Sequence, residues 1–502
     1  MGGFRRSLLC LLAVAALLAA PSNAAEEWNV GTGGDPARYG YCSALGPDDG
    51  TLLWQGGASA VIGWQPVTDG DVMVVARCFD IGDVLHGTLI YAYDIHDGQE
   101  LWSADLPVDF PSTDWRNHVS GIRNGVVYAS RAGNTNASYM YALDASDGSQ
   151  LWKSDDLVDE SSTEGVSFAP DGDLIVGNFN SVMRIDAGDG STVWTADRSS
   201  PTSNGSMVAV YGGKAYGWAS GSSGPTIEVF DLGNGDFLYE SPAVYGGYIQ
   251  QVAPFVGPDG TVYAPRSQNN PSTDYLVAFE DTGSGLAEKW ETELGYVPFS
   301  SFSVGSDGSV YSYSRSGEVV RLDPDDGSVL NTSMNVDAGI STYMAADGAG
   351  RLFVASESTI YSFNADLSLR WSASVSSVDA PAIAWDGTLI VCGTGTDIRA
   401  YEGEGTAVHG AHGSGIGGSS LRMASNPVRG TARIGFGLRQ PASAALRVYS
   451  AAGRLVQTRS LGSLQAGGHA HDLDVSQRPS GVYLLELVLD GAPAGTARMV
   501  VL

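Results

Sequence analysis

Three stretches of this chain repeat one pattern: YAYDIHDGQELW (91–102), YALDASDGSQLW (141–152) and MRIDAGDGSTVW (183–194). Each begins with alternating apolar residues, continues with an Asp and a Gly four positions later, and ends with a Trp four positions after the Gly. An Asp that hydrogen-bonds its own backbone, followed by a Gly with positive φ, is typical of a tight turn. The pattern therefore predicts two strands joined by this turn, with the Trp filling the space between neighbouring sheets.

Weaker copies extend the repeat in both directions. They are VFDLGNGDFLY (229–239), VAFEDTGSGLAEKW (277–290), RLDPDDGSVLN (321–331), SFNADLSLRW (362–371) and, without a preceding strand, GPDDGTLLW (46–54). The spacing is about 45 residues, the length of a four-stranded propeller blade. A second turn recurs between these copies, at 69–70, 124–125, 171–172, 212–213, 259–260, 307–308, 347–348 and 386–387. Eight such turns predict an all-β fold, an eight-bladed β-propeller.

The two ends of the array complement each other. The last blade has strand-like runs up to DIRAYEG (397–403) but no Trp strand, whereas the half-copy at 46–54 has a Trp strand with nothing before it. We expect residues 51–56 to pair as the outermost strand of the last blade. This closure would remove an exposed sheet edge.

The YALDxxxGxxxW pattern resembles the repeat of quinoprotein (PQQ-type) β-propellers, and WNVGTGGDPARYGY (28–41) resembles the lead-in of secreted bacterial members. The resemblance covers about residues 28–403 and implies the propeller fold. In this family, PQQ-dependent alcohol dehydrogenases carry two adjacent cysteines and a Glu/Asn/Asp calcium site. The present sequence has no adjacent cysteines and no matching set of acids. We therefore expect no PQQ, no metal site and no catalytic residues.

The N-terminus and the charge balance limit where the protein works. Residues 1–24 combine Arg5 and Arg6, an apolar run and a small-residue cleavage site, which predicts a signal peptide. No later run is long enough for a transmembrane segment. The chain has 27 basic and 56 acidic residues, a net charge of −29, which argues against a nucleic-acid partner.

After removal of the signal peptide, three cysteines remain: Cys42, Cys78 and Cys392. An oxidising compartment allows one disulfide with one thiol left over. Three small buried side chains are the alternative.

The composition changes after a Gly/Ser/His-rich linker at 404–420, so we place the propeller at 25–403 and a second domain at 421–502. The second domain has nine Arg, no Lys and four acidic residues. Its short alternating strands predict an immunoglobulin-like β-sandwich. VYSAAGRLV (448–456) and SGVYLLEL (480–487) resemble the C-terminal sorting domain of type IX secretion substrates, and equally the related module of flagellar hook-capping proteins. The sorting resemblance implies contact with the secretion machinery and delivery to the cell surface or medium.

The two faces of the predicted propeller differ. Because strands alternate in direction, the stereotyped Asp-Gly turns share one face, and long unlike loops share the other, which we call the loop face. These loops are 78–87, 106–117, 131–138, 243–250 and 266–274. Arg77, Arg131, Arg266 and Arg315 recur at one register beside them, with Trp115 and Tyr248 nearby. These six residues are candidates for binding an acidic glycan or a carboxylate-bearing partner. The alternative is local pairing of the arginines with acidic neighbours.

Two functional hypotheses follow. The first is an exported, non-catalytic propeller that binds a protein or glycan ligand on its loop face. The second is a secreted propeller enzyme, either a quinoprotein oxidoreductase or a polysaccharide-active protein. The sequence favours the first, because no catalytic triad or paired-carboxylate motif is present.

Overall fold

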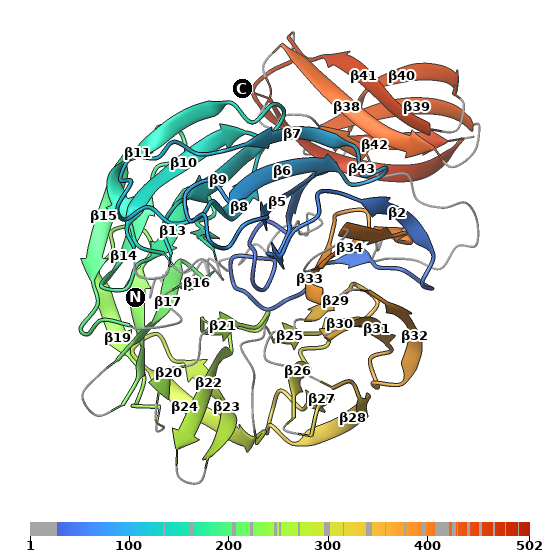
Figure 1. Cartoon of the computed structure of the whole chain (residues 1–502). Coiled ribbons are helices and arrows are strands. Elements are labelled where there is room, and N and C mark those ends of the chain that lie inside the picture. The colour runs from blue at the N-terminus through green and yellow to red at the C-terminus, as the bar shows by residue number, and fades with distance from the viewer. Residues whose placement is uncertain are drawn as a thin grey trace, which may run out of the picture.

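The computed structural model describes residues 28–501 with short gaps (Figure 1). The gaps are 134–135, 161–164, 203–206, 221–223, 245–247, 250–252, 270–271, 296–301, 315, 338–343, 357, 376–377, 394–397, 407–420, 424–427, 429, 439–441, 451–453, 465–466, 477 and 490. The predicted signal peptide and most of the predicted linker therefore lie outside the described residues.

Eight antiparallel sheets form the ring in Figure 1, and we number them as blades in chain order. Blade 1 contains β3 (Ile62–Gly63), β4 (Val67–Asp69), β5 (Val72–Cys78), β6 (Thr88–Asp94) and β7 (Glu100–Ala104), and blade 2 contains β8 (His118–Arg123), β9 (Val126–Ser130), β10 (Ser138–Asp144) and β11 (Gln150–Val158). Blade 3 contains β12 (Ser167–Phe168), β13 (Leu174–Gly177), β14 (Ser181–Ile185) and β15 (Thr192–Asp197), and blade 4 contains β16 (Ala209–Tyr211), β17 (Lys214–Ala219), β18 (Thr226–Asp231) and β19 (Phe237–Glu240).

Blades 5 to 8 complete the ring. Blade 5 contains β20 (Tyr248–Ile249), β21 (Phe255–Val256), β22 (Val262–Asn269), β23 (Ser272–Asp281) and β24 (Leu286–Glu293), and blade 6 contains β25 (Ser303–Val304), β26 (Val310–Tyr313), β27 (Glu318–Leu322) and β28 (Val329–Asn335). Blade 7 contains β29 (Met344–Ala346), β30 (Leu352–Ser356), β31 (Thr359–Phe363) and β32 (Leu369–Ser374), and blade 8 contains β33 (Val378–Ile383), β34 (Leu389–Gly393), β35 (Ile398–Tyr401) and β2 (Leu52–Gly56). The predicted eight-bladed propeller is confirmed.

The ring closes through its N-terminal strand, as the sequence predicts. β2 pairs antiparallel with β35, with Leu52 opposite Tyr401 and Gly56 opposite Ile398. Next to it, β1 (Ala44–Leu45) pairs with β36 (Gly405–Thr406). Two short pairings therefore join chain segments that are about 350 residues apart in the sequence.

The repeated Trp joins a blade to the next at five junctions. Its indole N–H donates to a backbone carbonyl of the following blade: Trp54 to Ile95 (2.7 Å), Trp102 to Ala145 (2.8 Å), Trp152 to Ala187 (3.0 Å), Trp194 to Leu232 (3.1 Å) and Trp290 to Pro324 (2.9 Å). The indole ring of each Trp lies on the turn glycine of the following blade. A Cβ on these glycines (Gly98, Gly148, Gly190, Gly235 and Gly327) would lie 2.5–2.7 Å from an indole carbon. Only glycine leaves room for the indole, so we call this contact the Trp–Gly latch.

Two junctions lack the Trp and use other contacts. Between blades 4 and 5, Tyr239 donates its hydroxyl hydrogen to Asp281 (2.6 Å), which also pairs with Lys214 (2.7 Å). Between blades 6 and 7, Asn331 occupies the Trp position, and the turn of blade 7 has Leu367 with positive φ (64°) where other turns have Gly. Leu367 is buried between the two blades, so its side chain occupies space that a Trp fills elsewhere.

Residues 28–44 form a belt across the innermost strands. Its backbone carbonyls accept hydrogen bonds from one blade after another: Trp28 from Thr68 (2.8 Å), Asn29 from Ile122 (2.9 Å), Pro36 from Val210 (2.7 Å), Ala37 from Val256 (2.9 Å), Tyr39 from Val304 (2.7 Å) and Gly40 from Ala346 (2.8 Å). Blade 3 is reached through Arg38, which donates to the carbonyl of Gly165 (2.9 Å). Cys42, at the end of the belt, packs in the core shared by blades 7 and 8.

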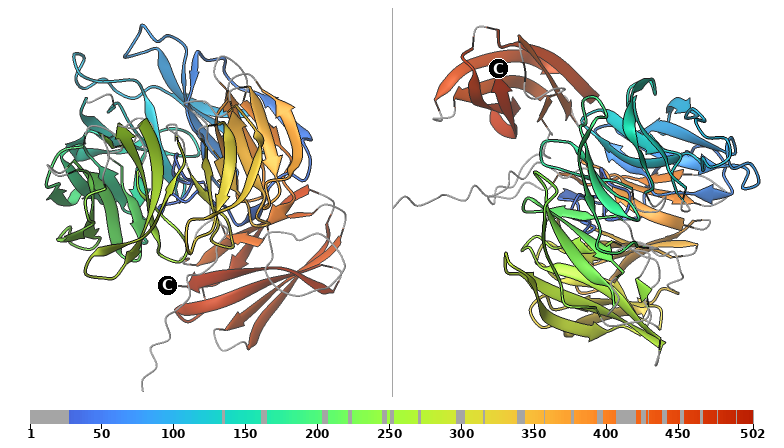
Figure 2. Two further views of the ribbon diagram at one scale, coloured as in Figure 1. Left: turned by 90° about the horizontal axis from the view of Figure 1, so that it is seen from below. Right: turned by 90° about the vertical axis from the view of Figure 1, so that its left-hand side faces the viewer.

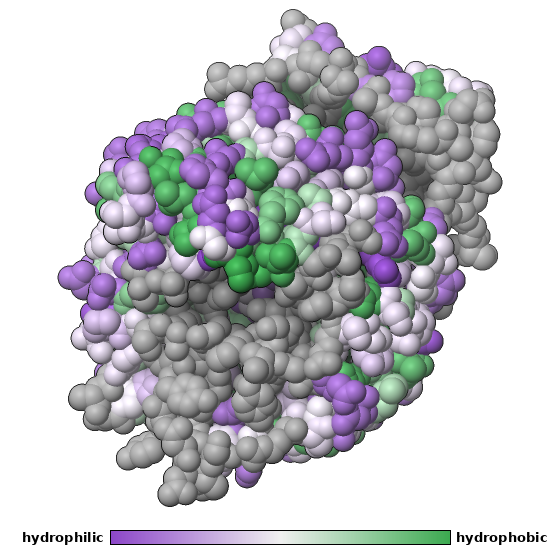
Figure 3. All heavy atoms as spheres, in the orientation of Figure 1, coloured by the Kyte–Doolittle hydropathy of each residue, from purple (hydrophilic) through white to green (hydrophobic). Residues whose placement is uncertain are grey.

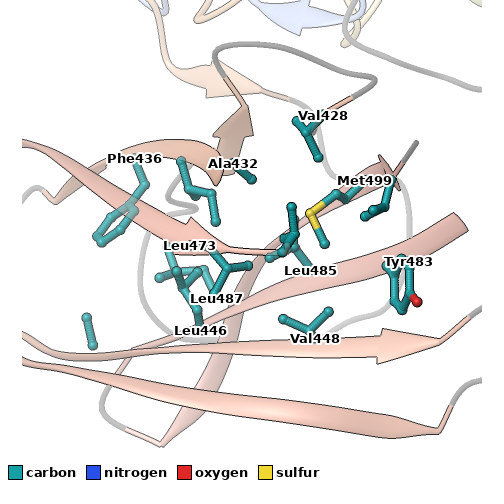
Figure 4. Close-up of a cluster of buried hydrophobic side chains, with 14 of the residues drawn as sticks. Val428, Ala432, Phe436, Leu446, Val448, Leu473, Tyr483, Leu485, Leu487 and Met499 are labelled. Carbon is teal, nitrogen blue, oxygen red and sulfur yellow. The ribbon is translucent and has the colours of Figure 1, made fainter. Parts of the chain in front are cut away.

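The C-terminal part is a sandwich of two sheets, drawn in orange and red in Figure 2. One sheet contains β37 (Leu421–Met423), β38 (Thr431–Leu438) and β41 (Gly467–Asp474), and the other β39 (Ala442–Ser450), β40 (Leu455–Leu464), β42 (Gly481–Leu489) and β43 (Ala492–Val501). Apolar side chains from both sheets, among them Phe436, Leu446, Leu473 and Leu485, form its core (Figure 4). The predicted immunoglobulin-like sandwich is consistent with this architecture.

The latch predicts that one glycine-to-alanine change is far more costly than another. Gly148 and Gly125 both have positive φ (74° and 77°), so each Ala variant bears a similar backbone strain of roughly 1–2 kcal/mol. A Cβ at Gly148 would also overlap Trp102, whereas one at Gly125 meets open space. We expect Gly148→Ala to lower the unfolding free energy by about 1–3 kcal/mol more than Gly125→Ala, measured by chemical denaturation. Equal losses in the two variants would contradict the latch.

Candidate functional site

The arginines predicted for the loop face lie beneath it. Arg77 and Arg131 are fully buried, at the ends of β5 and β9. Arg266 lies in β22, where it forms an ion pair with Glu291 and stacks its guanidinium 4.1 Å from the centroid of the Tyr275 ring. Arg315 lies outside the described residues.

Arg131 holds two long loops in place. Its guanidinium donates to the carbonyl oxygens of Leu85 (2.6 Å), Trp115 (3.1 Å) and Leu106 (2.8 Å), and to the carboxylate of Asp105 (2.5 Å). Leu85 belongs to loop 78–87 and Trp115 to loop 106–117. One buried cation therefore fixes the shape of both loops, because five N–H groups in a rigid plane can satisfy several carbonyls at once.

The remaining candidates are less available than the sequence suggests. Arg77 donates from Nε to the carbonyl of Ala58 (3.2 Å). One ring of Trp115 is covered by the guanidinium of Arg116, 4.5 Å from the centroid. Tyr248 lies in β20 opposite Ser267, and its side chain is outside the description. These contacts favour local pairing of the arginines, and ligand binding by the six residues stays a prediction.

Apolar and acidic side chains, by contrast, reach the surface of blade 1. Val61, Ile62, Phe79 and Ile81 are exposed, Ile81 by 60%. Asp80 and Asp83, in the same loop as Phe79 and Ile81, are exposed as well. Figure 3 shows hydrophobic side chains gathered near the centre of the ring, over the first blades of Figure 1. The sequence signal for this surface is a pair of apolar residues within each of two segments rich in small or acidic residues, GGASAVIG (56–63) and FDIGD (79–83). The arginine pattern does not indicate it.

Blades 2 and 3 enclose a buried carboxylate. Glu160 accepts hydrogen bonds from the hydroxyls of Ser120 (2.5 Å) and Ser130 (2.6 Å). Burial raises the pKa of Glu160 to about 7, although these two hydrogen bonds lower it. Nearby on β8, burial lowers the pKa of His118 to about 4, so the imidazole is neutral at physiological pH.

These groups do not form a recognisable catalytic or metal centre. Within the described residues, no group of three or more His, Cys, Asp or Glu side chains could hold a metal ion. Cys42, Cys78 and Cys392 are buried thiols rather than partners in a disulfide. The described part of the chain also contains no helix with the length and hydrophobicity of a membrane span.

The fold and its faces define a class, the PQQ-like β-propellers that carry a C-terminal secretion domain. The family model described as outer membrane protein assembly factor BamB matches residues 38–156, 136–288, 167–333 and 272–460, so the chain belongs to this family. The secretion system C-terminal sorting domain matches residues 425–501. This domain indicates export through the type IX system to the cell surface or medium.

Solved structures support the fold alone. BamB from Moraxella catarrhalis superposes with a TM-score of 0.51 and 15% identity, over 70% of this chain and 98% of that one. The Dos1 propeller gives 0.52 and 11%, over 70% and 95%, and the C-terminal WD40 domain of Sif2 gives 0.50 and 13%, over 70% and 98%. The search of curated proteins found no match.

The buried Glu160 predicts a specific pH dependence. Its pKa is higher in the folded state (about 7) than in the unfolded state (4.5), so the folded protein binds the proton more tightly. Stability is therefore lost as the pH rises from 4.5 through 7. We expect Glu160→Gln, which keeps the shape and cannot ionise, to gain about 3 kcal/mol relative to wild type between pH 4.5 and pH 8. Denaturation curves of both proteins at several pH values measure this, and parallel pH profiles would show that Glu160 titrates normally.

Proposed function

We propose that this exported propeller is a non-catalytic scaffold that binds a protein or glycan partner with its loop face. The observation that carries the proposal is the construction of that face. Arg131 is buried and uses its guanidinium to fix loops 78–87 and 106–117 in one shape. Loops held in one conformation lose little entropy on binding, which is how a rigid scaffold gains affinity.

The alternative of a quinoprotein enzyme has less support. The PQQ-dependent members described above combine adjacent cysteines with a calcium site made of acidic and amide side chains. Here the cysteines are separate buried thiols, so the two adjacent cysteines of those members have no counterpart. This difference favours the scaffold over the quinoprotein enzyme.

One experiment separates the two functions. The full mature chain is applied to an array of glycans and synthetic peptides, and in parallel is incubated with PQQ and calcium while the absorbance of bound quinone and alcohol oxidation are followed. We expect selective binding on the array and no quinone-dependent activity. Quinone binding accompanied by turnover, or an array without any bound ligand, would contradict the scaffold.

The C-terminal domain should affect delivery and leave the propeller folded. The sorting match begins at 425, and the propeller sheets end at 401 with their own cores. We expect deletion of residues 421–502 in the producing cell to leave the denaturation curve of the propeller unchanged and to abolish its appearance at the surface or in the medium. A matched control is Leu455→Ser, an exposed side chain of the sandwich, which should be delivered normally.

A further inference from the structure

Loop 79–87 of blade 1 is closed on itself by hydrogen bonds. The backbone N–H groups of Phe79 and Asp80 both donate to the carbonyl of Gly87 (2.7 and 3.2 Å), and Gly87 donates back to the carbonyl of Asp83 (3.0 Å). A Cβ at Gly87 would lie 2.1 Å from the carbonyl oxygen of Asp80, so the close approach requires glycine. The segment is a compact Ω-loop whose ends meet.

Two arginines and an internal carboxylate fix this loop from below. Arg131 donates to the carbonyl of Leu85 (2.6 Å), and Arg116, which is also buried, donates to the carbonyl of Ile81. Asp83 accepts from the backbone N–H groups of Leu85 (3.1 Å) and His86 (2.9 Å). These polar contacts hold the loop in its conformation, together with the edge contact of Phe79 on Tyr91.

The apolar side chains of the loop are partly exposed, and the Phe79 ring also packs edge to face against Tyr91, with the centroids 6.0 Å apart. Phe79 and Ile81 are 37% and 60% exposed, and the adjoining Val61 and Ile62 are 47% and 37% exposed. Val61 donates its N–H to Cys78 (2.8 Å) and Ile62 lies opposite Cys78, so both segments belong to one surface. Apolar side chains that remain exposed together on a rigid support are typical of an interaction site.

The loop itself carries two exposed carboxylates, Asp80 and Asp83. A backbone hydrogen bond from His86 lowers the pKa of Asp83, which keeps it ionised. The nearby cations, Arg116 and Arg131, are buried beneath the loop. Asp105 is already paired, with Arg131 (2.5 Å) and with His86 (3.2 Å). A partner that complements this surface carries positive charge around apolar side chains.

We propose that the Ω-loop surface of blade 1 (Val61, Ile62, Phe79, Ile81, Asp80 and Asp83) binds a segment of another protein in which apolar residues are flanked by Lys or Arg. The inference rests on the proposed scaffold function and names the class of its partner. It reverses the sign of the ligand expected from the arginine pattern, because the cations are buried and the carboxylates are exposed.

The test uses synthetic 12-residue peptides in which the numbers of Leu and Lys are varied independently, applied to the full mature chain. We expect wild type to bind the Leu/Lys peptides at least tenfold more tightly than peptides with Ser in place of Leu. In Phe79→Ser/Ile81→Ser this dependence on Leu should disappear, while the weaker dependence on Lys and salt remains. Because Phe79 also contacts Tyr91, the variant is first required to give the same denaturation curve as wild type, and Ile81→Ser alone, at a side chain 60% exposed, is measured beside it.

The matched control removes two exposed apolar side chains elsewhere. Leu151→Ser/Val193→Ser, on the outer strands of blades 2 and 3, should retain the full dependence on Leu. The inference is overturned if the Phe79/Ile81 variant keeps that dependence, or if wild type instead self-associates through this surface or binds only glycans there. If ligands found on the array bind the Phe79/Ile81 variant as tightly as wild type, only this inference is overturned. If no array ligand binds wild type, the scaffold function itself is overturned.

Discussion

The Trp–Gly latch is the contact on which the ring depends. It joins neighbouring blades by placing an indole where a Cβ would be, so it combines a hydrogen bond, a large apolar surface and a backbone conformation that favours glycine. At the closure the latch is made by Trp54 of β2, which lies on Gly98 of blade 1. Trp371 of blade 7 lies less closely against Gly50, where a Cβ would be 3.3 Å from the indole. The N-terminal half-copy of the repeat thus supplies blade 8 with its outermost strand and its Trp.

The sequence predicts the ring well, because the latch needs particular residues at fixed spacing. Trp102, Gly148 and their counterparts recur at a regular spacing, from which the number of blades can be predicted. Trp54, whose copy of the repeat has no preceding strand, identifies the closing strand. The belt leaves no such trace. Except for Arg38, which reaches blade 3, its contacts to the blades use backbone carbonyls, which every residue possesses, so nothing periodic in residues 28–44 indicates that they cross seven blades.

The site was harder to predict for a related reason. The register of Arg77 and Arg131 indicates the correct face of the propeller, but not whether a guanidinium turns outward to solvent or inward to carbonyls. Arg131 is buried and donates hydrogen bonds to loop carbonyls, and a sequence pattern does not predict such backbone contacts. Once the cations are inside, the surface charge is that of the remaining aspartates. Burial therefore decides the electrostatic character of the loop face, and composition alone does not.

The belt has a consequence for the order in which the molecule assembles. Residues 28–44 and β2 are made first, yet their partners include Ala346 in blade 7 and β35 in blade 8, which are made last. Contacts between distant segments must wait for the whole intervening chain, so Gly40 and β2 stay without these partners until blades 7 and 8 exist, whereas Trp28 can already bind blade 1. The ring cannot finish folding while the chain is still emerging, and its completion coincides with the arrival of the segment that leads to the sorting domain.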